Sequence, residues 1–130
     1  MQILGIGVDI VENSRIKKSL RNKLFITRIF TPTEIADSKK TENKTNHYSK
    51  RFAAKEAFAK SINTGFVNDL NFKDITVVNN KAGRPSFVIT KKLKMIVKKQ
   101  FKTSSFKFFL SISDEKKYSI AYVILQKTWW

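Results

Sequence analysis

The sequence contains no cysteine among its 130 residues. Disulfide bonds, thiolate metal sites and a cysteine nucleophile are therefore excluded. No apolar run is long enough to cross a bilayer, and the N-terminus lacks the basic and apolar regions of a secretory signal. Internal repeats and low-complexity linkers are absent as well. We therefore expect one cytoplasmic domain that spans residues 1–130 and does not enter the membrane.

Acidic residues are scarce, because 10 Asp and Glu stand against 26 Lys and Arg, and the net charge is +16. Such a charge favours an anionic partner, which can be nucleic acid, a polyphosphate cofactor, an acidic protein or an anionic membrane surface. A lysine-rich composition from an AT-biased genome explains much of the excess equally well. The charge alone does not choose between these partners. A hydrophobic content of 42% and 11 phenylalanines indicate a folded chain.

Alternating apolar residues predict a first strand over residues 3–10 and two short strands over 75–78 and 86–89. The segments 106–113 and 118–126 predict a hairpin that closes the chain. With helices between these strands, the order predicts an α+β fold with a mainly antiparallel sheet. The two sides of the first strand carry different residues, with Leu4, Ile6, Val8 and Ile10 on one side and Ile3, Gly5, Gly7 and Asp9 on the other.

Helix start signals occur near Ser14, Thr31 and Thr90. A further helix is expected from residue 51 to about residue 62, with Gly65 as the left-handed residue that ends it. The polar stretch 39–46 is expected to be a loop, and His47 just beyond it is expected at the surface.

Two carboxylates stand out against this background. Asp9 follows two glycines, which let a ligand or another backbone approach closely, although Asp9 can also simply end the strand and cap the next turn. Glu56 lies on a helix that is apolar on both sides, so it is expected to be buried and to need a partner. Lys60, four residues later, is one candidate for that partner, and a metal ion is the other.

The motif G-I-G-V-D-I-V-E spans residues 5–12, and R-F-A-A-K-E-A-F-A-K spans residues 51–60. Together they resemble the holo-[acyl-carrier-protein] synthases, the short single-domain members of the 4′-phosphopantetheinyl transferases. The similarity continues through Thr64-Gly65, Gly83-Arg84-Pro85 and residues 111–115, so it covers essentially the whole chain.

The resemblance implies transfer of the 4′-phosphopantetheine arm of coenzyme A to a serine of acyl carrier protein, with release of adenosine 3′,5′-bisphosphate. This activity would support fatty acid biosynthesis. It implies Mg²⁺ held by Asp9 and Glu56, an ion that prefers carboxylates together with substrate phosphates. Lys60 would neutralise phosphate charge, or form a helical ion pair with Glu56. Glu56, or a water that it orients on the metal, would accept the serine proton.

Further roles also follow from the resemblance. Carrier protein, which is acidic, would dock on the basic residues Arg15, Arg21 and Arg28. The chain would form a homotrimer with sites at the subunit boundaries, and mutual repulsion of three basic copies would make the assembly salt-sensitive. The residues implied for coenzyme A are Arg51, Lys60, Gly65, Gly83, Arg84, Pro85 and Ser113, the last contributed by the neighbouring chain. Among them, Arg51 can instead be a purely structural arginine.

Two other interpretations compete with this one. A small basic nucleic-acid-binding protein would use the charge and the phenylalanines, but the sequence has no RNP motif, and buried carboxylates would repel phosphate without a metal. We therefore expect neither nucleic acid nor a membrane as a partner. A catalytically silent family member is the second alternative. It rests on Phe109, which stands where several relatives carry a histidine close to the active site.

Overall fold

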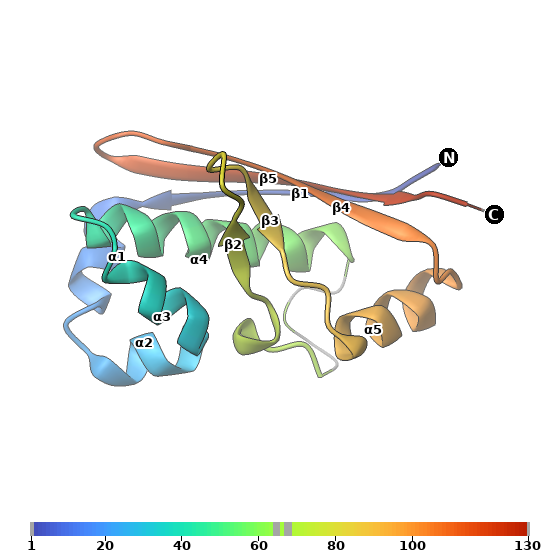
Figure 1. Ribbon diagram of the computed structural model, residues 1–130, viewed down its shortest axis with the longest axis horizontal. Coiled ribbons are helices and arrows are strands. Elements are labelled where there is room, and N and C mark those ends of the chain that lie inside the picture. The colour runs from blue at the N-terminus through green and yellow to red at the C-terminus, as the bar shows by residue number, and fades with distance from the viewer. Residues whose placement is uncertain (1, 64–65, 67–68, 130) are drawn as a thin grey trace.

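The computed structural model describes residues 2–63, 66 and 69–129. A long helix, α4 (Lys44–Ser61), lies against one face of a three-stranded antiparallel sheet (Figure 1). The sheet has the order β1 (Gln2–Glu12), β5 (Tyr118–Lys127) and β4 (Phe106–Asp114). The predicted α+β fold with an antiparallel sheet is confirmed.

Most of the remaining elements lie on the side of α4 away from the sheet, and α5 lies beyond the C-terminal end of α4 (Figure 1). A two-stranded ribbon crosses the helix, and three short helices gather near its N-terminal end. Within the described ranges, no helix combines the length and apolar character needed to span a bilayer. The elements are α1 (Asn13–Ser19), α2 (Lys23–Ile29), α3 (Pro32–Ser38), the 3₁₀ turn η1 (Phe72–Asp74), β2 (Val77–Asn79), β3 (Pro85–Phe87) and α5 (Lys91–Phe101).

The sheet and α4 touch through their backbones. A Cβ atom added to Gly5 would overlap the carbonyl oxygen of Ser61, and one added to Gly7 would overlap that of Ala57. The two glycines of β1 therefore admit another backbone, which was one of the two possibilities that the sequence left open. The register of β1 shifts between Ile3 and Gly5. This irregularity places Leu4 against the core and leaves Ile3 59% exposed, so the predicted sides of these two residues are wrong.

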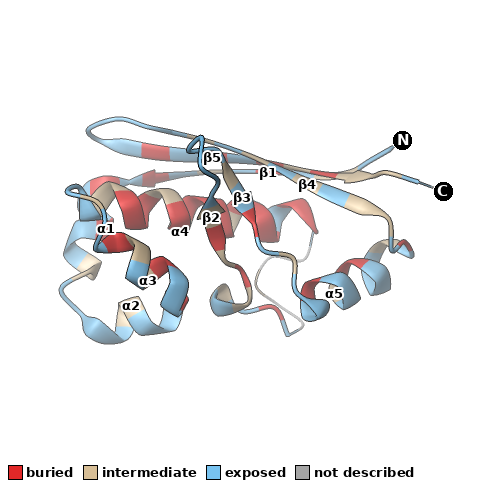
Figure 2. Cartoon of the chain, viewed as in Figure 1, coloured by how far each residue is buried: buried red, intermediate tan, exposed pale blue. Residues whose placement is uncertain are grey.

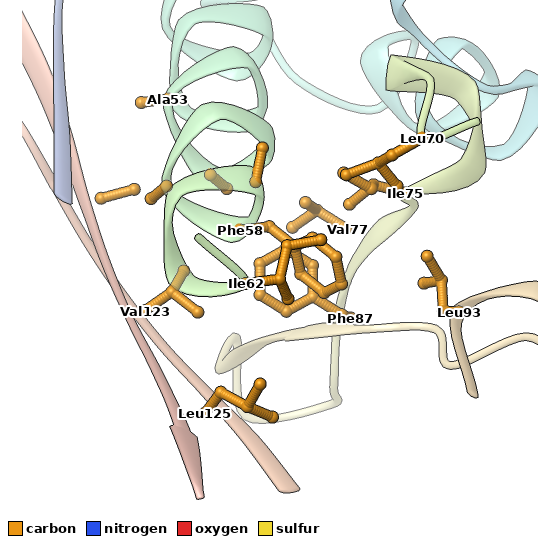
Figure 3. Packing of buried hydrophobic residues seen from close by; sticks show 14 of the residues in the cluster. Ala53, Phe58, Ile62, Leu70, Ile75, Val77, Phe87, Leu93, Val123 and Leu125 are labelled. Atoms are coloured by element: carbon orange, nitrogen blue, oxygen red, sulfur yellow. The ribbon is translucent and has the colours of Figure 1, made fainter. Parts of the chain in front are cut away.

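The core lies around α4 and is closed by the ribbon and the inner face of the sheet. Phe58 packs against Phe87 at 4.9 Å and against Phe108 at 4.4 Å between ring centroids. Ile62 lies beside them, facing Val77 and Phe87 (Figure 3). Most of α4 is buried, whereas the outer face of the sheet is largely exposed (Figure 2). The prediction of a buried helix is therefore confirmed for most of α4, but Phe52 and Glu56 are half-buried and Lys60 is exposed.

Several local predictions need correction. The stretch 39–46 is not a loop throughout, because α4 begins at Lys44, with Asn43 accepting a hydrogen bond from the Asn46 backbone. His47 is consequently buried, and its Nε2 lies 2.8 Å from the carbonyl oxygen of Glu34. Helix α2 was not predicted, although Asn22 caps it.

The predicted helix starts near Thr31 and Thr90 are confirmed, because Thr31 caps α3 in a capping box with Glu34 and Thr90 caps α5. Helix α1 begins after Glu12 without a side-chain cap, and the Ser14 hydroxyl donates to Glu12 instead. The left-handed residue after α4 is Asn63, with φ of 65°. Gly65, to which the sequence assigned that role, lies outside the described residues.

Glu34 and Lys55 form a fully buried ion pair, with 2.7 Å between Oε1 and Nζ. The Lys55 ammonium also donates to the carbonyl oxygens of Phe72 and Ile75, while the Glu34 carboxylate accepts from the backbone N–H of Val77. Burial lowers the pKa of Lys55, and the charge of Glu34 opposes that change. The pair connects α3, α4 and the segment before β2. The sequence signal near Thr31 predicts only the start of a helix and does not indicate this ion pair.

The burial of His47 predicts a loss of stability in acid. Burial and the nearby charge of Arg51 lower the pKa of His47 to about 4, from an ordinary value of about 6.5. Between those values the unfolded chain binds a proton that the folded chain does not. The free energy of unfolding should therefore fall by about 2 kcal/mol as the pH drops from about 7 to about 4.5.

Urea unfolding at both pH values measures this change. Other groups titrate in the same window, so the control is His47→Gln, which removes only the contribution of the imidazole. The variant should lose less stability than the wild type over the same interval. Equal losses in the two proteins would contradict the prediction.

Candidate active site

Asp9 and Glu56 line the same pocket, which we call the carboxylate pocket, with a volume of about 390 Å³. Asp9 comes from β1 and Glu56 from the middle of α4, so the fold brings together two acids that are 47 residues apart in the chain. Lys60 and Arg15 line it too. The rest of the lining is largely apolar and consists of Ile10, Val11, Glu12, Ile16, Ser19, Phe25 and Phe52.

The close contact of strand and helix sets the position of both acids. Asp9 follows Gly7 by two residues, so both face α4 on the same side of the strand. Glu56 directly precedes Ala57, whose carbonyl group meets Gly7. The two carboxylates therefore project from positions next to the backbone contact between Gly7 of β1 and Ala57 of α4.

Asn13 fixes the start of α1, and with it the position of Arg15 at the pocket. Its side-chain amide donates to the carbonyl oxygens of Glu115 and Lys116 at 2.9 and 3.2 Å. Its oxygen accepts from the Ser119 hydroxyl at 2.8 Å. This buried residue holds the β4–β5 turn against the end of β1. Sequence analysis missed it, because an asparagine at the start of a helix signals only a cap.

Lys60 links the two acids electrostatically. Its ammonium group lies 3.1 Å from Asp9 Oδ1 and donates to the Val8 carbonyl oxygen, also at 3.1 Å. The helical ion pair with Glu56 that the sequence allowed is not among the ion pairs of the described residues, although the charge of Lys60 does lower the pKa of Glu56. Lys60 thus joins α4 to β1.

Both acids are destabilised in their charged forms. Burial raises the pKa of Asp9, and Lys60 only partly opposes it. Burial also raises the pKa of Glu56, and the negative charge of Asp9 raises it further. A bound divalent cation would relieve both the lost hydration and the mutual repulsion.

The donor set fits Mg²⁺. Two carboxylates leave most positions of an octahedral ion free for water and substrate phosphate, which is how this ion is commonly held. Groups of three or more His, Cys, Asp or Glu suited to a metal are absent from the part of the chain that the structure describes. A complete cage made by the protein alone is therefore not expected from those residues.

A second hollow, the hairpin cavity, lies beside the β2–β3 ribbon. Arg51, Gly83 and Pro85 line it, so the structure gathers three of the residues implied for coenzyme A. An adjoining hollow of about 400 Å³ also contains Arg51. Gly83 has φ of +81°, and the Asn80 side chain accepts from two backbone N–H groups of the same loop.

Arg51 has a structural role and keeps a donor free. It is buried and donates to the His47 carbonyl oxygen at 3.1 Å. Its Nε atom is buried without a hydrogen-bond partner among the described residues. Arg84 lies on the loop with an exposed side chain and lines neither cavity. Arg51 therefore lies at both hollows as a buried side chain, whereas Arg84 is exposed beside them.

The two cavities lie on different faces of α4. Glu56 and Lys60 face the carboxylate pocket, whereas Lys50 and Arg51 face the hairpin cavity. The two hollows share no lining residue within the described ranges. A ligand that contacts residues of both the carboxylate pocket and the hairpin cavity therefore cannot lie within a single cavity of one chain.

The remaining predicted site residues are exposed. Arg21 lies between α1 and α2, and Arg28 lies in α2. Neither residue lines the carboxylate pocket. Ser113 lies on the outer face of β4, opposite Ile120 of β5. Phe109 is 43% exposed on that face, with the Lys107 ammonium 5.0 Å from its ring centroid.

Comparison with known proteins identifies the family of the chain. The family model of the 4′-phosphopantetheinyl transferase superfamily matches residues 5–123, and the chain belongs to this superfamily. Within it, the chain is similar to holo-[acyl-carrier-protein] synthases. The one from Pelagibacter ubique is 71% identical over 127 residues, which cover 98% of this chain and 99% of the relative. The one from Ehrlichia chaffeensis is 43% identical, with 95% and 96% covered.

The chain is also similar in structure to holo-[acyl-carrier-protein] synthases. The holo-[acyl-carrier-protein] synthase of Neisseria meningitidis superposes with a TM-score of 0.87 at 34% identity, covering 97% of this chain and 100% of the other. The enzyme of Bacillus anthracis, solved in complex with CoA (3′,5′-ADP), gives a TM-score of 0.81 at 33% identity, with 98% and 100% covered. The resemblance drawn from the sequence motifs is confirmed.

Proposed function

We propose that Asp9, Glu56 and Lys60 form the active site at which this transferase moves the 4′-phosphopantetheine group of coenzyme A to a serine of apo acyl carrier protein. Adenosine 3′,5′-bisphosphate is the second product. The observation that supports the site most directly is the pocket shared by the two carboxylates and Lys60. Both carboxylates are desolvated and repel each other, as expected of a site built to hold a cation.

Each residue has a role that its position supports. Asp9 and Glu56 would hold Mg²⁺, which supplies a Lewis acid for the charge that develops on the phosphoryl oxygens. Lys60 would donate to the same oxygens from one turn further along α4. Because the pKa of Glu56 is raised, this carboxylate is also suited to accept the proton of the attacking serine.

The transfer itself is measured by mass spectrometry. Apo acyl carrier protein incubated with the enzyme, coenzyme A and Mg²⁺ should gain the mass of one phosphopantetheine group, and EDTA should abolish the gain. Activity that survives EDTA would remove the metal from the proposal. A protein that binds coenzyme A but transfers nothing would instead be the silent family member that Phe109 allows.

Replacement of Lys60 by methionine should separate metal binding from transfer. The Lys60 ammonium lies 3.1 Å from Asp9 Oδ1 and would repel a cation held by Asp9, so its removal should tighten Mn²⁺ binding about five- to tenfold in the absence of coenzyme A. The rate of transfer should fall at the same time, because a donor to phosphate is lost. Calorimetry gives the affinity, and Lys99→Met, an exposed residue of α5, is the control. Weaker Mn²⁺ binding in the variant would show that Lys60 only positions Asp9.

We also propose that the carrier protein docks over α1 and α2, with Arg15 closest to the chemistry. Arg15 lines the carboxylate pocket, and Arg21 and Arg28 extend the positive surface outward. Arg15→Glu should raise the KM for carrier protein at least tenfold and leave the affinity for coenzyme A unchanged. Lys98→Glu on α5 is the matched charge reversal. Equal effects of the two reversals would indicate general charge rather than docking at α1.

We further propose a homotrimer in which each site combines two chains. The outer face of the sheet exposes apolar side chains, among them Ile6 at 55%, Val8 at 46% and Ile10 at 62%. Contiguous apolar surface of this kind marks an interface. Since the hairpin cavity and the carboxylate pocket lie apart in one chain, a neighbour that supplies its hairpin cavity and Ser113 would complete the site.

Light scattering tests the assembly. The wild type should have the mass of three chains, and Ile120→Glu, on the central strand of the outer face, should give single chains without activity. Met95→Glu changes an exposed apolar residue of α5, outside the sheet, and should remain trimeric. An active single chain would contradict the composite site.

A cytoplasmic location, where disulfides are rare, suits a chain without cysteine and completes the proposal.

A further inference from the structure

Helix α5 presents a lysine-rich face that the roles above leave unused. Leu93 and Val97 are buried and hold the helix against the core. The opposite side of the helix centres on Met95, which is 71% exposed. We call this side the lysine face, and it consists of Lys91, Lys92, Lys94, Met95, Lys98, Lys99 and Lys102. None of these residues lines the carboxylate pocket or the hairpin cavity.

The positive charge of the lysine face is largely unbalanced. Residues 75–113 contain nine Lys and Arg and no Asp or Glu. Among the ion pairs of the described residues, only the pair of Lys92 with Asp74 involves this face. Helix α5 lies at the end of the molecule away from α1 and α2 (Figure 1). The lysine face is therefore a second basic surface, separate from the one proposed to receive the carrier protein.

Apolar groups accompany the lysines at this end of the molecule. The backbone N–H of Thr128 donates to the carbonyl oxygen of Ser105 at 3.0 Å, so the chain end lies close to the C-terminal end of α5. Trp129, the next residue, is 63% exposed. A hollow of about 360 Å³ also opens beside Lys94, and its lining includes the rings of Phe87, Phe106 and Phe108. A partner of the lysine face would thus meet both cations and apolar surface.

We propose that the lysine face binds the surface of an anionic bilayer and attaches the enzyme peripherally to membranes. Each lysine close to such a surface strengthens binding about fivefold, so five lysines favour an anionic over a neutral surface about 10³-fold. The exposed Met95 and Trp129 suit the headgroup region, where tryptophan is enriched. Because the lysine face is separate from the carboxylate pocket, an attached enzyme would still expose its active site to the carrier protein.

Nucleic acid is the other polyanion that such a charge can bind. The lysine face contains no arginine, although arginine is the residue that matches phosphates and guanine bases with paired hydrogen bonds. Its centre is Met95, an apolar side chain that a sugar-phosphate backbone leaves in water and a bilayer interface does not. The total charge of the chain predicts no particular partner. The grouping of lysines around an exposed apolar residue favours a lipid surface.

Sedimentation with vesicles tests the proposal. The wild type should bind vesicles made of equal parts phosphatidylglycerol and phosphatidylcholine, should not bind phosphatidylcholine alone, and should be released at about 0.5 M salt. Lys98→Gln/Lys99→Gln should bind about 25-fold more weakly. Lys17→Gln/Lys18→Gln removes the same charge from α1 and should lose less than about twofold. Equal losses in the two double variants, or a wild type that does not bind anionic vesicles, would overturn the inference.

Tryptophan fluorescence shows which end of the molecule meets the bilayer. Both tryptophans are the last two residues of the chain, so their emission reports on this end alone. It should shift to shorter wavelengths with anionic vesicles, and Met95→Gln, which keeps every charge, should weaken vesicle binding about threefold. Vesicle binding without the shift, or tighter binding of double-stranded RNA at equal phosphate concentration, would overturn the inference. Transfer measured without vesicles should be equal in Lys98→Gln/Lys99→Gln and the wild type, which separates this inference from the proposed function.

Discussion

Asp9→Asn should reduce the rate of phosphopantetheine transfer about 100- to 1,000-fold, and Glu56→Gln should do the same. Each change keeps the size of the side chain and removes the charge that would hold Mg²⁺. Asp9→Asn also removes the negative charge that pairs with Lys60, whose ammonium lies 3.1 Å from Asp9 Oδ1. The rates are measured from the mass of the carrier protein over time.

Metal binding and folding are measured alongside the rates. Both variants should bind Mn²⁺ at least tenfold more weakly than the wild type and unfold at nearly the same urea concentration. Glu42→Gln, an exposed carboxylate outside the carboxylate pocket, is the control and should retain full activity. A variant at either position with wild-type turnover would disprove the active site proposed here.

Lys55→Met should lower the free energy of unfolding by about 3–5 kcal/mol. The change leaves the fully buried Glu34 carboxylate without its cation, 2.7 Å from where the ammonium lay. It also removes the donor to two backbone carbonyl oxygens. Urea unfolding at neutral pH gives the value. If the variant does not fold, its absence from the soluble fraction likewise indicates a loss of stability.

The double variant Glu34→Gln/Lys55→Met tests the cause. The double variant removes both charges, and the glutamine oxygen can still accept a hydrogen bond from the backbone N–H of Thr31. The double variant should therefore be more stable than Lys55→Met alone. Lys92→Met breaks an exposed ion pair with Asp74 and should cost less than about 1 kcal/mol. If the double variant is no better than the single one, the loss comes from packing rather than from an unpaired charge.

Much of the fold could be predicted from local sequence signals. Alternation located β1, β4 and β5, and capping residues located α3 and α5, because those patterns arise within a few residues of chain. His47 and Lys55 show the limit of such reasoning. Both are polar residues whose burial depends on partners far away, Glu34 in α3 and the segment near Phe72. Nothing adjacent to either residue in the sequence indicates those partners.

The candidate site shows the same division. The family motifs placed Asp9, Glu56 and Lys60 together, and the structure brings them to one pocket. The sequence did not reveal that Lys60 bonds to Asp9 rather than to Glu56, since helical spacing favours the nearer residue. It also did not reveal that Arg51 faces a different hollow, because that depends on the rotation of α4 against the sheet.

The backbone contact between β1 and α4 has a consequence for mutational scans. Gly5 and Gly7 lie where any side chain would overlap a helix carbonyl oxygen, so even alanine must push the strand and the helix apart. The separation of the two acids would change with it. In a screen for growth or turnover, these glycines should therefore score with the catalytic residues although neither is proposed to touch substrate, and a survey that ranks positions by loss of function would overstate the extent of the site.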